Sequence, residues 1–512
     1  MKKLLVLFLA LIMVLGVLAA CGPKQNGPSD PSGKSQYDEE APLPRTTYNG
    51  KTYTVLYRQG TRYEEEWISD ETRKGDVIND AIASRNQAVT DRYGVALDYE
   101  SGKVSAASFE NEFWAKVTTN REDDVYQLVA GYTYLLATAS VKGYCLNWLN
   151  KDQIPVVDTD ADWWDSDFIQ AAKYNGSTYI ATGPLSLTDM YSSACIFFNK
   201  ELLNQLRGEK VGDGYSNATE ELFALVNNGG WTLEKMMEYA ADCTQTVEGD
   251  ETGENTIYGI TTNESTMIDA YIYASDLVMT QRNKSTGVIE LVNVKSSPIL
   301  DLSEKLCKFY NVSGNGLLTS TLDPEYVQHL CEGKAVFACG VLSSAKDIQQ
   351  TAKELQYGVI PYPKYDEAQE KYHTYKLDYK TGFCIPRAVY THNNQEFVGT
   401  ITEALAYYSN KFVKPALYEK VLTHKLVQDR DSSECVDKIL DGGLYEFANI
   451  YAYAWGDQES PAHLLRKVVQ KNQDYYNQYR NNSSRYQLQL NNLLKSFVSD
   501  DIVAPDDAGA AE

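Results

Sequence analysis

The chain has 512 residues, of which 43% are hydrophobic and 23% are charged, and its formal net charge is −23 at pH 7. This composition is typical of a soluble globular body, and the length suffices for two domains of ordinary size. Binding to nucleic acid requires clustered Lys and Arg side chains. The sequence contains no such basic stripe, so we expect no nucleic-acid partner.

The first twenty residues have the pattern of a secretory signal peptide. Two lysines near the start precede an almost wholly apolar run at residues 4–20, whose last members Ala19 and Ala20 come just before Cys21. An uncleaved membrane helix is the alternative, because the apolar run is nearly long enough to span a bilayer. The abrupt change to polar residues after Cys21 favours cleavage instead.

The motif Leu18-Ala-Ala-Cys21 resembles the bacterial lipobox, whose cysteine receives a diacylglyceryl thioether and becomes the mature N-terminus. Two or three acyl chains hold a protein at a membrane far more firmly than one chain does. The next residues are rich in Gly, Pro, Ser and charge, and they cannot bury enough apolar surface to fold. We therefore expect a lipoprotein signal peptide at 1–20, a lipid anchor at Cys21 and a disordered tether at 21–47.

Strands and helices alternate along the rest of the chain, which predicts α/β architecture. β-Branched and aromatic residues indicate strands, and apolar residues at helical spacing indicate helices. In the first part of the chain we expect strands at 51–57, 95–99 and 124–130, a helix from near Val77 that ends before Gly94, and a helix at 109–117.

The same patterns continue to the C-terminus. A helix is expected to begin at Trp231-Thr-Leu-Glu234, with Thr232 as its N-cap. The other expected elements are strands at 195–198, 258–261, 335–338, 357–360 and 383–385, helices from Lys200 and at 267–278, and mostly helices from Glu396 to about Ser499.

Eight cysteines remain after Cys21, and their spacing argues against a zinc or redox site because no CxxC pair occurs. They are Cys145, Cys195, Cys243, Cys307, Cys331, Cys339, Cys384 and Cys435. We expect most of them to be small buried apolar residues, although an exported chain could oxidise them.

No motif for catalysis or metal binding is present. The five histidines are widely separated, and the chain lacks HExxH, Walker A, GxSxG and a GxGxxG element after a strand. Residues 248–259 resemble a calcium-binding loop only faintly, because the spacing of the ligands is wrong. We therefore expect a protein that is not an enzyme, and we identify no cofactor or metal site.

Aromatic residues are abundant, with 38 Tyr, 14 Phe and 7 Trp. Some lie among polar residues, notably in the stretches 162–167 and 451–457. Flat rings beside carboxylates and amides suit a sugar, whose C–H face stacks while its hydroxyl groups form hydrogen bonds. For Trp163 and Trp164 we prefer the alternative that the pair covers a domain edge, whereas Trp455 fits both roles equally.

Six short motifs follow one another in a fixed order. They are Ile180-Ala-Thr-Gly183, Cys195-Ile-Phe-Phe-Asn-Lys-Glu-Leu202, Gly229-Gly-Trp-Thr-Leu-Glu234, Glu332-Gly-Lys-Ala-Val-Phe-Ala338, Tyr357-Gly-Val-Ile-Pro-Tyr-Pro363 and the helical region 415–434. In this order, over residues 50–460, they resemble the family 1, carbohydrate-type extracellular solute-binding proteins of bacterial ABC importers. Each motif is weak alone, and the order behind a lipobox carries the resemblance.

The resemblance implies a two-lobe, periplasmic-binding-protein-like α/β fold with three hinge crossovers and a helical C-terminal region. By position we expect the crossovers near 181–184, 336–340 and 381–384. The implied division is 48–180 plus 340–380 for lobe 1, 184–336 plus 384–460 for lobe 2, 461–499 for C-terminal helices and 500–512 for a disordered tail. Insertions such as 204–228 leave the size of the ligand open.

Ligands of open α/β sheets bind outside the carboxyl ends of the strands. Residues that follow expected strands are therefore candidates for ligand binding: Arg58, Tyr63, Tyr132, Tyr134, Asn263, Glu264, Gly340 and Ser343. The resemblance adds Asp189 and Tyr191 near the first crossover and Trp455 as a stacking platform. Trp231 opens a helix, and this position favours a packing role.

These features predict a lipid-anchored, monomeric solute-binding protein at the outer face of the cell membrane. It would capture a small solute, expected to be a mono- or oligosaccharide, by hinge closure between two lobes, and deliver it to the permease subunits of an ABC importer. A surface glycan-active enzyme, which would consume its ligand, and a ligand-sensing ectodomain, which would serve no permease, are the alternatives.

Overall fold

The structure is a computed structural model that describes residues 41–102, 115, 117, 126–247, 255–320, 325–419, 427–456 and 459–497. The signal peptide, Cys21, most of the tether, nearly all of the helix expected at 109–117 and the C-terminal tail lie outside the described residues. Within the described residues, no helix combines the length and the apolar character needed to cross a membrane.

The first sheet has the strand order β12-β3-β1-β2. Its strands are β1 (Thr52–Arg58), β2 (Ala96–Gly102), β3 (Leu128–Tyr132) and β12 (Thr381–Cys384). β1 runs parallel to β2 and β3, whereas β12 is antiparallel to β3. The carboxyl ends of β1 and β3 therefore lie at the same edge of the sheet.

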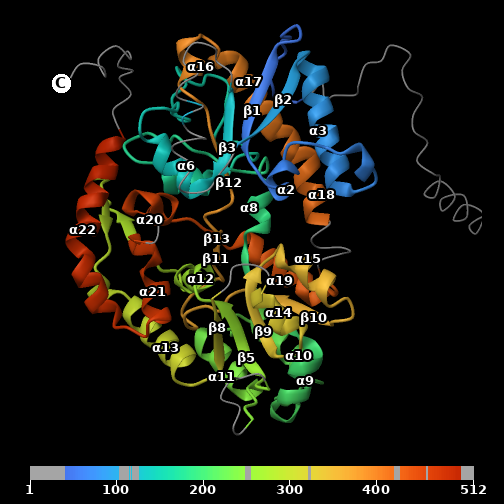
Figure 1. Cartoon of the computed structure of the whole chain (residues 1–512), viewed down its shortest axis with the longest axis vertical. Coiled ribbons are helices and arrows are strands. Elements are labelled where there is room, and N and C mark those ends of the chain that lie inside the picture. The colour runs from blue at the N-terminus through green and yellow to red at the C-terminus, as the bar shows by residue number, and fades with distance from the viewer. Residues whose placement is uncertain are drawn as a thin grey trace, which may run out of the picture. The chain divides into compact units, whose positions relative to one another are not determined.

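The helix between β1 and β2, α3 (Val77–Tyr93), begins and ends where the sequence predicts. The Asp76 carboxylate accepts hydrogen bonds from two N–H groups of the first turn, at 3.0 and 3.2 Å, and so caps the helix. Gly94 follows the last turn with a φ of 59°, a left-handed conformation that glycine tolerates best. α3 packs against α17 (Gln395–Tyr408) beside the first sheet (Figure 1).

The second sheet has five strands in the order β10-β4-β9-β5-β8. They are β4 (Ala194–Asn199), β5 (Tyr258–Asn263), β8 (Gly316–Thr319), β9 (Ala335–Val341) and β10 (Tyr357–Ile360). β4 and β9 are buried along their whole length, as expected for apolar strands covered on both faces. Figure 1 shows the second sheet below the first, with α8 (Leu187–Tyr191) between them.

The remaining elements of the described chain are mostly helices. Those before β4 or after β12 are α2 (Thr61–Glu64), α6 (Thr133–Ser140), α7 (Ser166–Ala172), α16 (Ala388–Thr391), α18 (Lys414–Glu419), α19 (Arg430–Asp441), α20 (Phe447–Ile450), α21 (Leu464–Gln470) and α22 (Tyr475–Ser496). Those between β4 and β10 are α9 (Lys200–Arg207), α10 (Ala218–Asn227), α11 (Leu233–Cys243), α12 (Thr266–Ala274), α13 (Ile299–Asn311), α14 (Glu325–Cys331) and α15 (Ser344–Thr351). Two small ladders join β6 (Thr280–Arg282) to β7 (Ile289–Leu291) and β11 (Thr374–Tyr375) to β13 (Gly443–Leu444).

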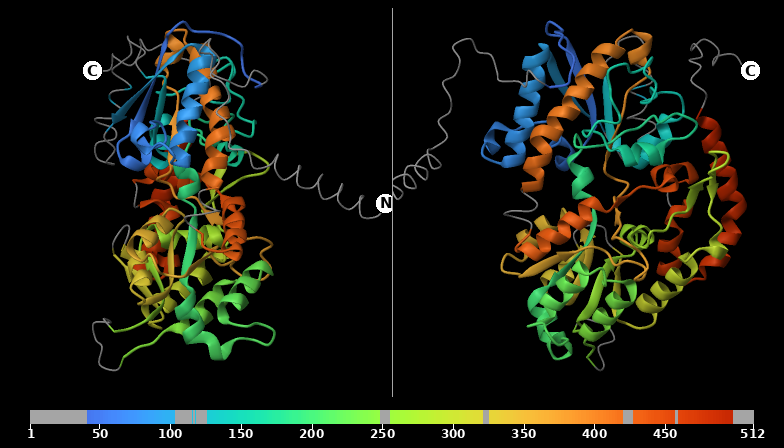
Figure 2. Two further views of the ribbon diagram at one scale, coloured as in Figure 1. Left: turned by 90° about the vertical axis from the view of Figure 1, so that its right-hand side faces the viewer. Right: turned by 180° about the vertical axis from the view of Figure 1, so that it is seen from behind.

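The C-terminal region is mostly helical, as predicted. α22 (red in Figure 2) runs along one side of the molecule and packs on α21, α13 and the short 3₁₀ helix η7 (Ala452–Trp455). The expected helix at 267–278 ends earlier, at Ala274, where α12 closes.

Helix α11 lies directly on strand β5. Thr232 caps α11 as predicted, since its hydroxyl oxygen accepts a hydrogen bond from the Lys235 N–H group. A Cβ atom at Gly259 would lie 2.0 Å from the carbonyl oxygen of Ala240, so only glycine permits this approach. Trp231 is fully buried, and its Nε1 donates to the Pro361 carbonyl oxygen at 3.1 Å. The predicted packing role of Trp231 is therefore confirmed.

The strand pairing corrects the expected division of the chain at the second crossover. Residues 336–340 lie inside β9, and the following strand β10 pairs with β4, so the chain stays in the second sheet up to Ile360. It returns to the first sheet only at β12, and α17 then packs on α3. Residues 340–360 thus belong with the second sheet and residues 395–408 with the first, the reverse of the expectation.

The first crossover lies near its expected place. Ala181 forms an isolated antiparallel bridge with Phe383 of β12, and the chain then passes through α8 into β4 of the second sheet. The third crossover, expected at 381–384, coincides with β12, which is itself a strand of the first sheet.

Trp163 and Trp164 join the segment at 158–164 to α17. Their indole Nε1 atoms donate to the two carboxylate oxygens of Glu403, each at 2.8 Å, and the Asp158 N–H group donates to the same carboxylate at 3.1 Å. The Trp164 ring also packs edge-on against Trp148, with centroids 5.1 Å apart.

The stability of the protein should depend on the protonation of Glu403. Burial raises the pKa of Glu403 from 4.5 to about 7, so the native state holds a proton that the unfolded chain releases between these values. The free energy of unfolding should therefore fall as pH rises through this window, by roughly 3 kcal/mol. Urea denaturation of wild type and Glu403→Gln at pH 5 and pH 8 checks this. Between pH 5 and pH 8, Glu403→Gln should lose less unfolding free energy than wild type. An equal loss in both proteins would contradict the raised pKa of Glu403.

The cysteines are buried thiols, as expected. Seven of the eight described cysteines are buried, Cys331 is half-buried, and all eight are free.

Candidate functional site

Two parallel strands of the first sheet bring four of the predicted residues to one place. β1 ends at Arg58, and β3 ends at Tyr132, which precedes the first turn of α6 with Tyr134. α2 follows β1 after the turn at Gly60, whose φ of 128° favours glycine, and it carries Tyr63 back over the strand end.

We call Arg58, Tyr63, Tyr132 and Tyr134 the Arg58 cluster. The guanidinium carbon of Arg58 lies 3.8 Å from the ring centroid of Tyr63 and 3.1 Å from that of Tyr132, so both rings make cation–π contacts. The Tyr63 and Tyr132 rings are 6.0 Å apart at 75°, and the Tyr132 and Tyr134 rings are 5.8 Å apart. The positions predicted from the strand ends thus come together in space.

The Arg58 guanidinium lies in a partly desolvated setting. Its Nε and Nη1 atoms are buried and find no hydrogen-bond partner within the described part of the chain. Burial lowers the pKa of Arg58 to about 10 and raises the pKa of Tyr63. The cluster therefore combines a positive charge with three aromatic rings.

A fourth ring at the cluster was not predicted. Tyr453, in η7, packs edge-on against Tyr134 with centroids 6.2 Å apart. Trp455, the expected platform, is only 3% exposed, and its Nε1 donates to the Tyr486 carbonyl oxygen of α22 at 3.1 Å. Residues two apart on a 3₁₀ helix point in different directions, so only one of the two can face the cluster. The aromatic residues in the stretch 451–457 predicted a stacking ring there, but their pattern did not indicate which of them faces the cluster.

Two other predicted residues, Asn263 and Glu264, lie at the carboxyl end of β5 in the second sheet. The side-chain oxygen of Asn263 accepts a hydrogen bond from the Ser265 N–H group at 2.8 Å, and the Glu264 N–H group donates to the Thr319 carbonyl oxygen. Arg466 of α21 reaches the same turn, where it donates to the Ser265 hydroxyl at 3.3 Å and pairs with the buried Asp269 carboxylate. Arg466 was not predicted.

Tyr191, Gly340 and Ser343 form a separate buried group at the end of β9. The Ser343 N–H group donates to the Tyr191 carbonyl oxygen at 3.2 Å, and Lys346 lies 4.4 Å from the Tyr191 ring. Tyr191 and Ser343 are each 4% exposed. Within the described residues, no hydrogen bond, ion pair or ring contact links this group to Arg58.

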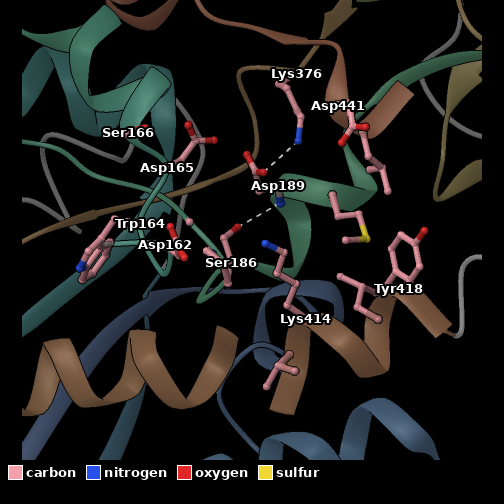
Figure 3. A pocket seen from close by; sticks show the side chains of 16 residues that line it. Asp162, Trp164, Asp165, Ser166, Ser186, Asp189, Lys376, Lys414, Tyr418 and Asp441 are labelled. Atoms are coloured by element: carbon pink, nitrogen blue, oxygen red, sulfur yellow. Dashed lines mark hydrogen bonds and ion pairs between the residues drawn. The ribbon is translucent and has the colours of Figure 1, made fainter. Parts of the chain in front are cut away.

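Asp189 is held by the segment that enters β12. One of its carboxylate oxygens pairs with Lys376 at 3.0 Å (Figure 3). The other pairs with Lys380 at 2.8 Å. Burial alone would raise the pKa of Asp189, but the two ammonium groups outweigh it and hold that pKa well below its ordinary value. Asp189 therefore joins α8 to the 376–380 segment.

A pocket of about 360 Å³ borders Asp189. Figure 3 shows Asp162, Asp165 and Ser186 on one wall, and Lys414 and Tyr418 of α18 on another. The 376–380 segment contacts the Arg58 cluster as well, since the Tyr63 hydroxyl donates to the Tyr379 carbonyl oxygen at 3.4 Å. Asp189 thus holds in place the 376–380 segment, which contacts the Arg58 cluster and leads into β12.

The Arg58 cluster presents aromatic rings and a guanidinium hydrogen-bond donor. No group of three or more His, Cys, Asp or Glu side chains that could hold a metal ion occurs in the ranges described above. Aromatic rings with a few polar groups are typical of small-molecule sites.

Solved structures share this fold. The GacH receptor of Streptomyces glaucescens aligns with 86% of this chain and 99% of its own at 12% identity and a TM-score of 0.51. The galacto-N-biose-/lacto-N-biose I-binding protein of a Bifidobacterium longum ABC transporter, solved with lacto-N-biose, aligns with 87% and 98% at 11% identity and a TM-score of 0.53. A cyclo/maltodextrin-binding protein in complex with maltotetraose aligns with 88% and 97% at 14% identity and a TM-score of 0.51.

These similarities confirm the two-lobe, periplasmic-binding-protein-like α/β fold expected from the sequence. No protein-family model matches the sequence, and no curated protein matches it either.

Proposed function

We propose that this protein is the extracellular solute-binding protein of a bacterial ABC importer and that it captures a saccharide at the Arg58 cluster. One observation carries the proposal: three tyrosines predicted from strand ends gather at the Arg58 guanidinium. Tyr63 and Tyr132 contact it, and Tyr134 packs on Tyr132. The fold is shared with proteins that were solved with lacto-N-biose or maltotetraose bound. In this account the protein binds its solute without converting it.

The chemistry of the cluster suits a sugar. The faces of Tyr132 and Tyr134 can stack on the C–H face of a pyranose ring, and Arg58 can donate to its oxygens. Glu264 and Arg466, at the carboxyl end of β5, would supply polar groups from the other lobe. Closure of the two lobes about the crossover segments would then enclose the solute.

Removal of one stacking ring should weaken capture. We expect Tyr132→Ala to lower saccharide affinity by about 2 kcal/mol, because it removes a central aromatic contact. Isothermal titration calorimetry of the variant against wild type measures this difference. Tyr215→Ala is the matched control, since Tyr215 is 37% exposed and lies in the 204–228 insertion. An unchanged saccharide affinity in Tyr132→Ala would show that the Arg58 cluster does not bind the saccharide.

The proposal includes a lipid anchor at Cys21, which would keep the protein at high effective concentration beside its permease. Cys21→Ala should leave the chain without lipid and with its signal peptide uncleaved. Metabolic labelling with a fatty acid, followed by fractionation, tests this expectation. Normal lipid labelling of the variant would overturn the anchor.

A further inference from the structure

We infer, on the basis of the proposed function, that the captured saccharide carries a carboxylate, as a hexuronate does, and that Arg58 selects it. Neutral sugars would then be poorer ligands than their uronate counterparts. The inference follows from the charge balance around Arg58 and from the planar, bidentate donor geometry of a guanidinium.

Arg58 has no carboxylate partner among the described residues. Its Nε and Nη1 atoms are buried without an acceptor there, while the side chain as a whole is half-buried and so remains open on one side. Two other buried cations pair directly with carboxylates, since Arg466 pairs with Asp269 and Lys380 pairs with Asp189. A desolvated cation is costly without a counter-ion, and an anionic ligand group would remove that cost.

Two of the three acidic side chains that follow Tyr63, those of Glu65 and Glu66, are engaged elsewhere. Glu66 acts on Arg58 electrostatically, but its carboxylate oxygens accept hydrogen bonds from the hydroxyl groups of Thr188 and Thr381, at 2.9 and 2.7 Å. Burial also raises the pKa of Glu66. Glu65 pairs with Arg73 at 2.6 Å. Neither carboxylate takes the place of a ligand anion at Arg58.

The geometry of the guanidinium favours a planar anion. The guanidinium carbon lies over the rings of Tyr63 and Tyr132. These rings are inclined at 75° to each other, so no more than one of them can stack flat on the guanidinium plane. An N–H edge of arginine matches the two oxygens of a carboxylate in a bidentate pair. A neutral hydroxyl group would accept only one of these hydrogen bonds.

A hexuronate satisfies both parts of the cluster. Its carboxylate would pair with Arg58, while the C–H face of its ring would lie on Tyr132, Tyr134 or Tyr453. Amino acids and simple carboxylates offer the anion without the ring face, and neutral sugars offer the ring face without the anion.

Titration calorimetry of the full chain in detergent tests the inference, with galacturonate and galactose and their α-1,4-linked dimers as paired probes. Wild type should bind the uronate of each pair about tenfold to a hundredfold more tightly, and the difference should shrink as salt rises. Arg58→Gln should bind both members equally, and Arg58→Lys should recover only part of the preference because it keeps the charge without the planar N–H edge. Thermal melting of each variant confirms that it is folded.

The outcomes separate the inference from the proposed function. Equal or tighter binding of the neutral sugars by wild type would overturn the uronate assignment and leave saccharide capture intact. A uronate preference that persists in folded Arg58→Gln would overturn the role of Arg58. Absence of binding to every probe, together with absence of binding to other saccharides, would overturn both.

Discussion

Replacing Asp189 with alanine is expected to lower the free energy of unfolding by about 3–5 kcal/mol, because it leaves two buried ammonium groups without a counter-ion. Lys376 is 7% exposed and Lys380 is 1% exposed, so neither can turn to water without a change in the chain. Chemical denaturation followed by circular dichroism measures the loss.

Replacing the two lysines as well tests whether their unpaired charges cause the loss. Adding Lys376→Met and Lys380→Met to Asp189→Ala removes the unpaired charges and should restore much of the lost stability. Asp189→Asn, which keeps the shape but not the charge, should lose most of what the alanine variant loses. A loss below about 1 kcal/mol in the alanine variant would show that the ion pairs do not hold α8 to the 376–380 segment.

Trp231→Ala is expected to destabilise the protein by a similar amount, about 3–5 kcal/mol, because it empties a large volume in a close-packed core. The ring is fully buried, packs edge-on on Tyr239 with centroids 5.8 Å apart, and lies 6.2 Å from the ring of Phe337 in β9. The alanine variant also lacks the hydrogen bond from Trp231 Nε1 to the Pro361 carbonyl oxygen, which joins the start of α11 to the segment after β10.

Trp231→Phe is the matched variant, since it keeps most of the volume and should retain a larger share of the stability. Both variants should bind saccharide normally where they remain folded. A weakened affinity in a folded Trp231 variant would place this ring at the site and contradict its packing role.

Local signals predicted the elements well, because caps and apolar periodicity act over a few residues. The N-cap Thr232 and the helix that ends before Gly94 are examples. The predicted position of the second crossover, near 336–340, was wrong for a physical reason. The apolar run of β9 has the same pattern in either sheet, and only its pairing with β4 and β5 decides where it belongs.

The candidate site was predictable to the extent that strand ends determine it. Arg58 and Tyr132 follow from the rule for parallel strands, since both end at one edge of the first sheet. Tyr453 and Arg466 depend on how the C-terminal helices pack, and Asp189 depends on two lysines almost two hundred residues away. No local pattern encodes such contacts.

The most direct test of the central claim is calorimetric titration of the wild-type protein with a panel of mono- and oligosaccharides, neutral and acidic, with analysis of the recovered sugar. The account predicts saturable binding of at least one saccharide, which is recovered unchanged. A saccharide that is consumed would instead identify an enzyme, and the absence of binding across the panel would contradict saccharide capture.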